Sequence, residues 1–395
     1  AITAVALVRM FTTMAAAPLL GRYADRRNGP RVLMMVGSLA AGTALLLMAL
    51  MQELWQFYFL FGVVWGVAMT ALGGMILGPA IVSKWFVRKR GRALAIATMG
   101  VSAGGVVAIP LTTVFITLFG WRLAWAALGV VMIVTIFPLG AICMRRRPED
   151  VGLLPDGDSS EEAAQGAGRQ GGGNNQRGIA VQGSFTVKEA FRSRPFWVLI
   201  VADTLGAMAL SPVLIHQVAY VGDKGFGLGT AAVIGTMVAA FAAIGKVPWG
   251  MLAERIPVRY VMAFAFVSAG FSLGFLIQAE GLTLLYAYAV VFGLCMGSAP
   301  PLRNLAWASY FGRDHLGSIR GFATPLTRWA SGISPVFAAL IYDWAGSYDM
   351  AFVVFAISWS LSGLVVLFAG PPAEPSLAGP QPAVPQAESL VKERE

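Results

Sequence analysis

Residues 21–31, which read GRYADRRNGPR, join two strongly apolar segments and are the most informative stretch of this chain. A weaker copy, GMLAERIPVR, recurs at residues 250–259. Both copies begin with glycine, carry an acidic residue four positions later, and continue at once with arginine. The residues that define them are Gly21, Asp25, Arg26 and Arg31 in the first copy, and Gly250, Glu254 and Arg255 in the second. A charged hairpin repeated between long apolar segments indicates a membrane protein built from two similar halves.

The composition agrees with a chain that lies mostly in a membrane. Hydrophobic residues make up 57% of the sequence, charged residues 12%, and the mean hydropathy is +0.70. Soluble domains carry roughly 25% charged residues. Apolar runs of about 20 residues recur along nearly the whole chain, and each can cross roughly 30 Å of hydrocarbon as a helix. Because lipid cannot hydrogen-bond backbone amides, we expect an all-α membrane protein.

The net charge of +9 does not indicate a nucleic-acid partner, because the basic residues lie in short loops. They cluster at 22–31, 84–92 and 145–147, and these loops alternate with loops almost free of Lys and Arg, at 52–53 and 279–281. This alternation is typical of multi-spanning proteins, whose cytoplasmic loops are positive. It predicts a plasma-membrane protein (the inner membrane, in a bacterium) with both motif loops in the cytoplasm.

We expect about eleven membrane-spanning helices. The apolar runs place them at residues 1–20, 31–50, 55–82, 92–118, 121–143, 195–221, 229–252, 259–279, 282–309, 319–342 and 348–369.

Two segments are too polar to span a membrane. Residues 144–194 are polar and Gly-rich and predict a flexible cytoplasmic linker, with a short amphipathic helix near 185–191 on the membrane surface. Residues 370–395 are Pro-rich and then charged, which predicts a disordered cytoplasmic tail. The remainder divides into an N-terminal bundle, 1–143, and a C-terminal bundle, 195–369.

Three landmarks relate the two halves at a spacing of about 225 to 229 residues. They are Gly21 with Gly250, Phe86 with Phe311, and Gly120 with Gly346. The halves are therefore expected to be parallel repeats of six helices each. The helix at 195–221 then lacks a counterpart, and the chain begins with Ala. We expect a fragment without its first helix, with twelve in the complete protein; an eleven-helix design is the alternative.

The motif at 21–31 resembles the hallmark of the major facilitator superfamily, Gly-x-x-x-Asp-Arg-x-Gly-x-Arg. Within the superfamily, several strings resemble the monocarboxylate and oxalate–formate branch: KWF at 84–86 with RGRA at 90–93, RPED at 147–150, and YFGR at 310–313. One departure concerns Ala242, which stands where the branch often carries an aspartate four residues before a helix-8 cation. The resemblance implies a transporter with two six-helix bundles.

The motif glycines and acids are expected to join the two bundles. Gly21 and Gly250 allow a neighbouring helix to approach closely. The resemblance places Asp25 near the N-terminus of helix 11 and Glu254 near that of helix 5, where a positive helix end and arginines such as Arg92 or Arg320 attract an anion. These contacts would form a cytoplasmic latch during alternating access. The alternative is a solvated basic loop that only sets topology.

Five charged residues fall inside the apolar runs: the cations Arg9, Lys246, Arg303 and Arg328, and the acid Asp203. A charge at the bilayer centre costs about 2.5–3.5 kcal/mol on insertion scales. Four cations cannot all be paired by one acid, so the surplus positive charge predicts a cavity that binds an anion, most simply a carboxylate.

Lys246 and Arg328 are the leading candidates for substrate contact, because the resemblance implies basic residues on helices 8 and 11 that face the central cavity. Arginine can hold a carboxylate through two parallel hydrogen bonds, whereas lysine acts as a point charge. Arg9 and Arg303 are further candidates. The alternative for each is a structural ion pair or a side chain that extends to the membrane surface, above all for Arg303.

Asp203 and His216 are the candidates for proton coupling. Asp203 is either a proton carrier or the structural partner of a cation. His216 lies near the outer end of helix 7, where a structural role and a pH-sensing role both remain open.

Other classes of membrane protein lack support in the sequence. No P-loop is present for a primary pump, and two histidines with two scattered cysteines offer no catalytic, metal or cofactor site. We therefore expect a monomeric secondary carrier, not an enzyme, for a small organic anion such as a monocarboxylate or dicarboxylate, operating as a symporter if it is coupled to protons. The alternatives are an efflux carrier for another small molecule and a non-transporting membrane sensor.

Overall fold

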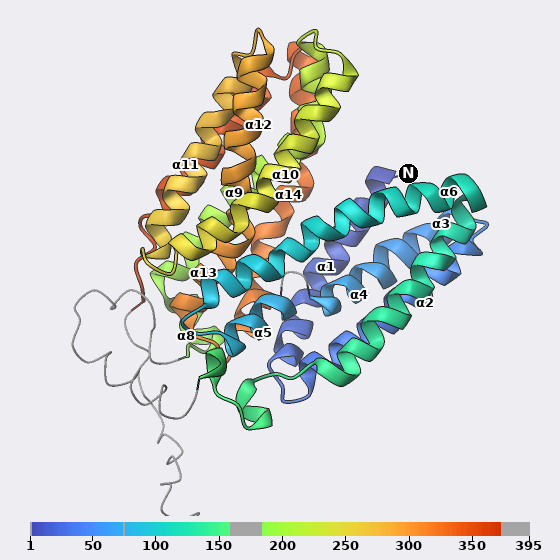
Figure 1. The fold of residues 1–395 in the computed structure, drawn as a ribbon, viewed down its shortest axis with the longest axis vertical. Coiled ribbons are helices and arrows are strands. Elements are labelled where there is room, and N and C mark those ends of the chain that lie inside the picture. Colours follow the sequence, from blue (N-terminus) through green and yellow to red (C-terminus); the bar gives the residue numbers. More distant parts are fainter. Residues whose placement is uncertain (1, 74–75, 159–183, 373–395) are drawn as a thin grey trace, which may run out of the picture.

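The computed structural model describes residues 2–73, 76–158 and 184–372, and every regular element within these ranges is a helix (Figure 1). The N-terminal elements are α1 (Ile2–Ala24), α2 (Gly29–Ala49), α3 (Leu54–Phe57), the π-helix η1 (Tyr58–Val64), α4 (Trp65–Leu72), α5 (Leu77–Trp85) and α6 (Arg90–Cys143). The short 3-10 helices η2 (Pro148–Val151) and η3 (Pro155–Gly157) follow. The C-terminal elements are α8 (Val187–Arg192), α9 (Arg194–Asp223), α10 (Leu228–Leu252), α11 (Val258–Ile277), α12 (Leu282–Gly297), α13 (Ala299–Phe311), α14 (Leu316–Ala345) and α15 (Asp349–Val366).

These helices form two bundles that meet at one end and diverge at the other (Figure 1). In the N-terminal bundle α2 packs against α6, and in the C-terminal bundle α11 packs against α15 and α10 against α12. The most extensive contacts between the bundles are made by two pairs of helices, α1 with α14 and α6 with α10. We call these pairs the α1–α14 seam and the α6–α10 seam. The expected two-bundle, all-α architecture is thus confirmed.

Eight helical segments in the described part of the chain are long and apolar enough to cross a membrane by themselves. The expected spans at α1, at the first part of α6 and at α14 are not among them. These are helices of the two seams, where arginine, serine, threonine and glycine replace larger apolar residues. Their polarity follows from their position, because a side chain that faces the opposite bundle does not face lipid.

Glycine and proline mark the ends or interruptions of several helices. Gly120 has φ 78° and interrupts α6, which confirms separate helices at 92–118 and 121–143. The spans expected at 55–82 and 282–309 are present as membrane-length apolar segments, but each is divided into shorter helices. The first breaks after Gly73, which has φ 77°, and the second at Ser298, directly before a helix with proline in its first turn. Proline cannot donate the backbone hydrogen bond that would continue the preceding helix.

The expected linker is partly ordered. At its start, Arg147 forms an ion pair with Asp314, and Arg313 forms another with Glu149 at 2.7 Å. At its end, Phe191 of α8 packs on Phe196, with ring centroids 4.6 Å apart, so α8 lies against the C-terminal bundle. The rest of the linker, and all but the start of the expected tail, lie outside the described residues.

Candidate functional site

The α1–α14 seam brings two backbones into direct contact. A Cβ atom on Gly21 would collide with the carbonyl oxygen of Gly317 and would lie 2.9 Å from the Cα atom of Gly321. Further along, Met10 packs against Gly332, so the two helices run antiparallel and stay in contact over much of their length. Only glycine allows this approach at the crossing point, because any larger residue would separate the helices.

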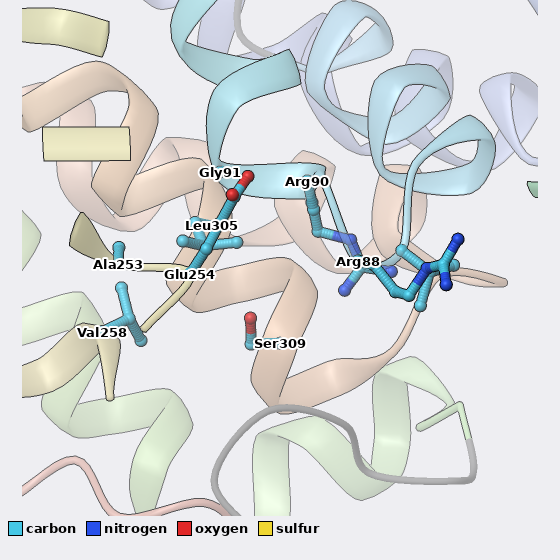
Figure 2. Close-up of a pocket in the computed structure, with 9 residues that line it drawn as sticks. Arg88, Arg90, Gly91, Ala253, Glu254, Val258, Leu305 and Ser309 are labelled. Carbon is cyan, nitrogen blue, oxygen red and sulfur yellow. The ribbon is translucent and has the colours of Figure 1, made fainter. Parts of the chain in front are cut away.

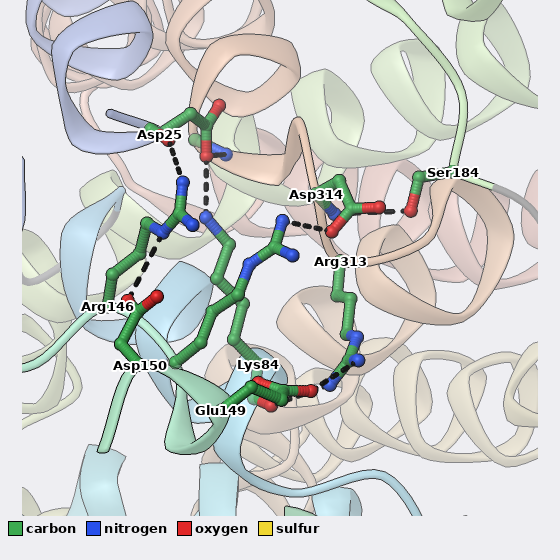
Figure 3. Close-up of polar contacts among 10 residues, drawn as sticks. Asp25, Lys84, Arg146, Glu149, Asp150, Ser184, Arg313 and Asp314 are labelled. Atoms are coloured by element: carbon green, nitrogen blue, oxygen red, sulfur yellow. Dashed lines mark hydrogen bonds and ion pairs between the residues drawn. The ribbon is translucent and has the colours of Figure 1, made fainter. Parts of the chain in front are cut away.

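Asp25 holds the first motif loop to the start of α14 (Figure 3). Its carboxylate accepts hydrogen bonds from the backbone N–H groups of Gly317 (3.3 Å) and Ser318 (2.7 Å), and from the Ser318 hydroxyl (2.7 Å). Lys84 Nζ donates a further bond of 2.9 Å to Asp25 Oδ1, and the Lys84 side chain is 1% exposed. Free N–H groups and the positive end of the helix dipole both favour an anion here.

The second motif copy makes the corresponding contact in the α6–α10 seam (Figure 2). Gly91 and Gly250 meet backbone to backbone, because a Cβ on either would collide with the carbonyl oxygen of the other. Glu254 accepts a bond of 2.9 Å from the backbone N–H of Arg92 and one of 2.8 Å from its Nε. Each motif acid therefore binds the N-terminus of a helix in the opposite bundle.

The structure does not bring every motif residue into these contacts. Arg26, Arg31 and Arg255 have exposed side chains, and Arg26 lies over the Tyr23 ring at 5.3 Å. Arg320, considered as a partner for a motif acid, instead lies over the Trp307 ring at 5.7 Å. The cation beside Asp25 is Lys84, which sequence reasoning did not select. Its position at the end of an apolar run, within KWF, was the available signal.

A second set of contacts, which sequence reasoning also missed, joins the segment after α6 to both bundles. We call the reciprocal ion pairs Arg147–Asp314 and Arg313–Glu149 the clasp (Figure 3). Nearby, the Asp156 carboxylate accepts hydrogen bonds from three successive backbone N–H groups of the α5–α6 turn, at 2.8–3.1 Å. The adjacent opposite charges in RPED and in the α13–α14 turn were the signal for the clasp.

Lys246 faces the opposite bundle rather than lipid. Its side chain lies in the α6–α10 seam, and the residue is 5% exposed. The ammonium donates hydrogen bonds to the backbone oxygen of Thr98 (2.9 Å) and to Ser102 Oγ (2.6 Å). Both acceptors are neutral and both belong to α6. A charged donor in the membrane interior is therefore held without a carboxylate.

Arg328 lies on the other seam and differs from Lys246 in its surroundings. Within the described residues no hydrogen bond or ion pair engages its guanidinium. The groups that act electrostatically on it are the cations Arg320, Arg303 and Arg9. Arg9 is exposed and lies over the Phe61 ring at 5.4 Å. The expected leading pair, Lys246 and Arg328, is thus divided between the two seams.

Asp203 and Arg303 form an ion pair inside the C-terminal bundle. Arg303 Nε lies 3.3 Å from Asp203 Oδ1, and Trp307 Nε1 donates a hydrogen bond of 3.0 Å to Asp203 Oδ2. Arg303 also lies over the Phe266 ring at 5.5 Å. Of the two roles considered for Asp203, the structural partner of a cation matches this geometry. Arg320 is also attracted electrostatically to Asp203, so this one acid serves two cations, Arg303 and Arg320.

His216 joins three elements at the end of the C-terminal bundle away from the motif loops. Its Nε2 lies 3.2 Å from the carbonyl oxygen of Pro335 in α14, and its Nδ1 lies 3.2 Å from the Tyr348 hydroxyl. A carbonyl oxygen can only accept, so Nε2 carries a proton and Nδ1 of the neutral ring accepts from Tyr348. Protonation of His216 would reverse the second bond without breaking the first.

Comparison with known proteins assigns the chain to a family. The model of the Major Facilitator Superfamily matches residues 1–234 and 205–393. The chain belongs to the major facilitator superfamily. Human monocarboxylate transporter 12 is 25% identical over 90% of this chain and 70% of its own length. The family and its named relatives are transporters rather than enzymes.

Solved structures of superfamily members share the fold. The proton:xylose symporter XylE superposes with a TM-score of 0.67 at 13% identity, covering 93% of this chain and 85% of that one. The human organic anion transporter MFSD10 also gives 0.67, at 15% identity, covering 92% and 83%. The family match and the apolar helices together indicate a multi-pass membrane protein. Within the described residues, no group of three or more His, Cys, Asp or Glu side chains could hold a metal ion.

Proposed function

We propose that this superfamily member is a secondary carrier for a small organic anion, a monocarboxylate or dicarboxylate, and that it works by alternating access. The observation that carries the proposal is Arg328, a half-buried cation on a seam helix whose guanidinium has no hydrogen-bond or ion-pair partner among the described residues. Such a group is costly in a membrane unless an anion accompanies it. A carboxylate fits the guanidinium because it can accept two parallel hydrogen bonds.

The other predicted substrate residues support an anion by their charge. Arg9 and Arg328 lie on facing helices of the α1–α14 seam, and Arg9 is the more accessible. Arg303 is engaged by Asp203, so we assign it to the positive field of the site rather than to direct contact. The Lys246 ammonium can bind the substrate only after its hydrogen bonds to α6 have been released.

Alternating access is supported by where the two bundles touch. The glycine crossings, the motif acids and the clasp all lie where the bundles meet, and the bundles diverge at the other end (Figure 1). The described conformation is therefore the one closed on the side of the motif loops. The breaks after Gly73 and at Ser298 occupy corresponding positions in the two halves, where interrupted helices are typical of transporter binding sites.

The orientation of the protein in the membrane and its coupling to protons follow from the basic loops and from His216. The basic loops support a plasma-membrane protein with motif loops in the cytoplasm, in which case the described state faces outward. His216, at the outer end and hydrogen-bonded to α14, is the group we assign to proton sensing. Asp203 is the alternative proton carrier. We propose a monomer, with proton symport tested by an imposed pH gradient.

Uptake into proteoliposomes by the full-length protein tests the function. Labelled pyruvate, lactate, oxalate and formate are the probes. We expect saturable uptake of at least one, and Arg328→Gln should raise its half-saturating concentration at least about tenfold, because a hydrogen bond to a charged group contributes about 1.5–3 kcal/mol. Arg31→Gln, at an exposed motif position, is the matched control. Normal anion uptake by folded Arg328→Gln would remove the basis of the assignment, and binding without uptake would indicate a sensor.

A further inference from the structure

The α6–α10 seam contains a cation that is held by the opposite bundle. Lys246 donates to the Thr98 carbonyl oxygen and to Ser102 Oγ, and these bonds lie further from the motif loops than the bond between Arg92 and Glu254. A helical side chain leans toward the N-terminus of its own helix. The Lys246 side chain therefore extends away from the motif loops, toward the end where the bundles diverge.

Along the face of α6 that meets α10, side chains become more accessible away from the motif loops. Ala95 is 0% and Thr98 9% exposed, whereas Ser102 is half-buried. The hydrogen bonds of Lys246 thus lie at the point where α6 leaves α10. An anion between the diverging bundles would meet Lys246 as the one basic side chain of α10.

The acceptors of Lys246 are poor partners for a charge. A carboxylate forms hydrogen bonds with an ammonium that are roughly twice as strong as those of a neutral oxygen. Ser102 and the Thr98 carbonyl are therefore weaker partners for the Lys246 ammonium than a carboxylate would be. The corresponding position in the other seam lacks such a contact, because Ala17, four residues before Gly21, occupies the place of Lys246, four residues before Gly250.

We propose that Ser102 is a positioning residue that competes with the transported anion for Lys246, so that binding of a carboxylate releases α10 from α6. The inference rests on the proposed anion transport. It assigns different roles to the two seams. Arg328 receives the anion without losing a protein partner, whereas Lys246 must exchange its bonds to α6 for bonds to the anion. Binding of the anion and loosening of the α6–α10 seam then occur in a single step.

The test removes the hydroxyl of Ser102 and leaves the charge of Lys246 in place. Ser102→Ala and Ser102→Val lack the acceptor, Ser102→Thr retains it, and Ser272→Ala is the control, because the Ser272 hydroxyl bonds only within its own helix. Two readouts are measured on the full-length protein. One is hydrogen exchange of residues 92–102 and 246–252 without anion, and the other is the half-saturating concentration for pyruvate and for oxalate.

We expect Ser102→Ala and Ser102→Val to exchange faster in this seam and to bind the anion about threefold to tenfold more tightly, since a competing bond has been removed. Ser102→Thr and Ser272→Ala should match the wild type, and adding anion to the wild type should speed exchange. Unchanged or weaker anion binding in both Ser102 variants would overturn this inference and leave the proposed function standing. Failure of the wild type to bind either anion would overturn both.

Discussion

Lys84 and Asp25 form a buried ion pair, 2.9 Å from Nζ to Oδ1, with side chains only 1% and 9% exposed. The Asp25 carboxylate also accepts hydrogen bonds from two backbone N–H groups and one hydroxyl at the start of α14. The pair therefore links α5, the first motif loop and the opposite bundle at one point.

Asp25→Asn should destabilise the protein strongly, because it leaves the Lys84 ammonium buried without a counter-charge. Removing one partner of a buried pair costs about 3–5 kcal/mol. Thermal unfolding in detergent measures the effect, with the exposed Arg31→Gln as control. The double variant Asp25→Asn/Lys84→Met should recover part of the loss. A single variant as stable as the wild type would show that the ion pair does not hold the bundles together.

Gly91→Ala should open the α6–α10 seam. Its new methyl group would collide with the Gly250 carbonyl oxygen, and overpacking of this kind costs about 1–3 kcal/mol. Gly104→Ala is the matched control on the same helix, because a methyl group there meets open space. Hydrogen exchange across residues 246–254 should rise in the first variant and not in the second. Equal exchange in both would contradict close backbone contact at Gly91.

Charge reversal tests the clasp between the segment after α6 and the α13–α14 turn. Both side chains of the Arg313–Glu149 pair are partly exposed, at 29% and 37%, so the pair contributes at most about 1 kcal/mol. Glu149→Arg should lower the unfolding temperature slightly, and more at low salt, since it places like charges together. The double variant Glu149→Arg/Arg313→Glu should restore the unfolding temperature. A double variant with the same lowered unfolding temperature as the single variant would exclude a direct ion pair.

The Asp203–Arg303 pair offers a separate test of coupling. Asp203→Asn should leave the Arg303 guanidinium without a counter-charge and lower stability by about 3–5 kcal/mol, whereas Asp203→Leu/Arg303→Met should be close to neutral. Proton-gradient-driven pyruvate uptake by the double variant then separates the two roles. Retained gradient dependence identifies a structural pair, and loss of it with pyruvate binding intact identifies Asp203 as the proton carrier.

A pH effect is expected at α8, outside the spanning helices. Hydrogen bonds from the Thr186 backbone N–H and hydroxyl lower the pKa of Glu189 below its usual value. A lowered folded-state pKa means that this capping contact stabilises α8 above the unfolded pKa of about 4.3 and is lost as the pH falls through the folded value. The protection of residues 187–192 against hydrogen exchange, relative to the intrinsic exchange rate at each pH, should therefore fall at acidic pH. Glu189→Gln, which keeps the capping geometry, should remove the dependence.

The sequence by itself determined the elements and the family. Apolar runs long enough to span a bilayer must form helices, because no other structure satisfies their backbone groups in lipid. The apolar runs separated the helices at 92–118 and 121–143, and the spacing of Gly21, Asp25 and Arg26 indicated the superfamily. These features depend on residues close together in the chain, so they can be recognised without knowledge of packing. The excess of intramembrane cations was visible in the same way.

Only the tertiary structure decided which charges meet. The partner of Asp25 is Lys84 rather than Arg320, and Lys246 binds Ser102 rather than sharing a site with Arg328. Each choice depends on where two helices cross and which way their side chains lean. At those crossings the glycine contacts leave no room for even one added methyl group. A sequence records the presence of a charge, but its partner depends on a crossing between segments far apart in the chain.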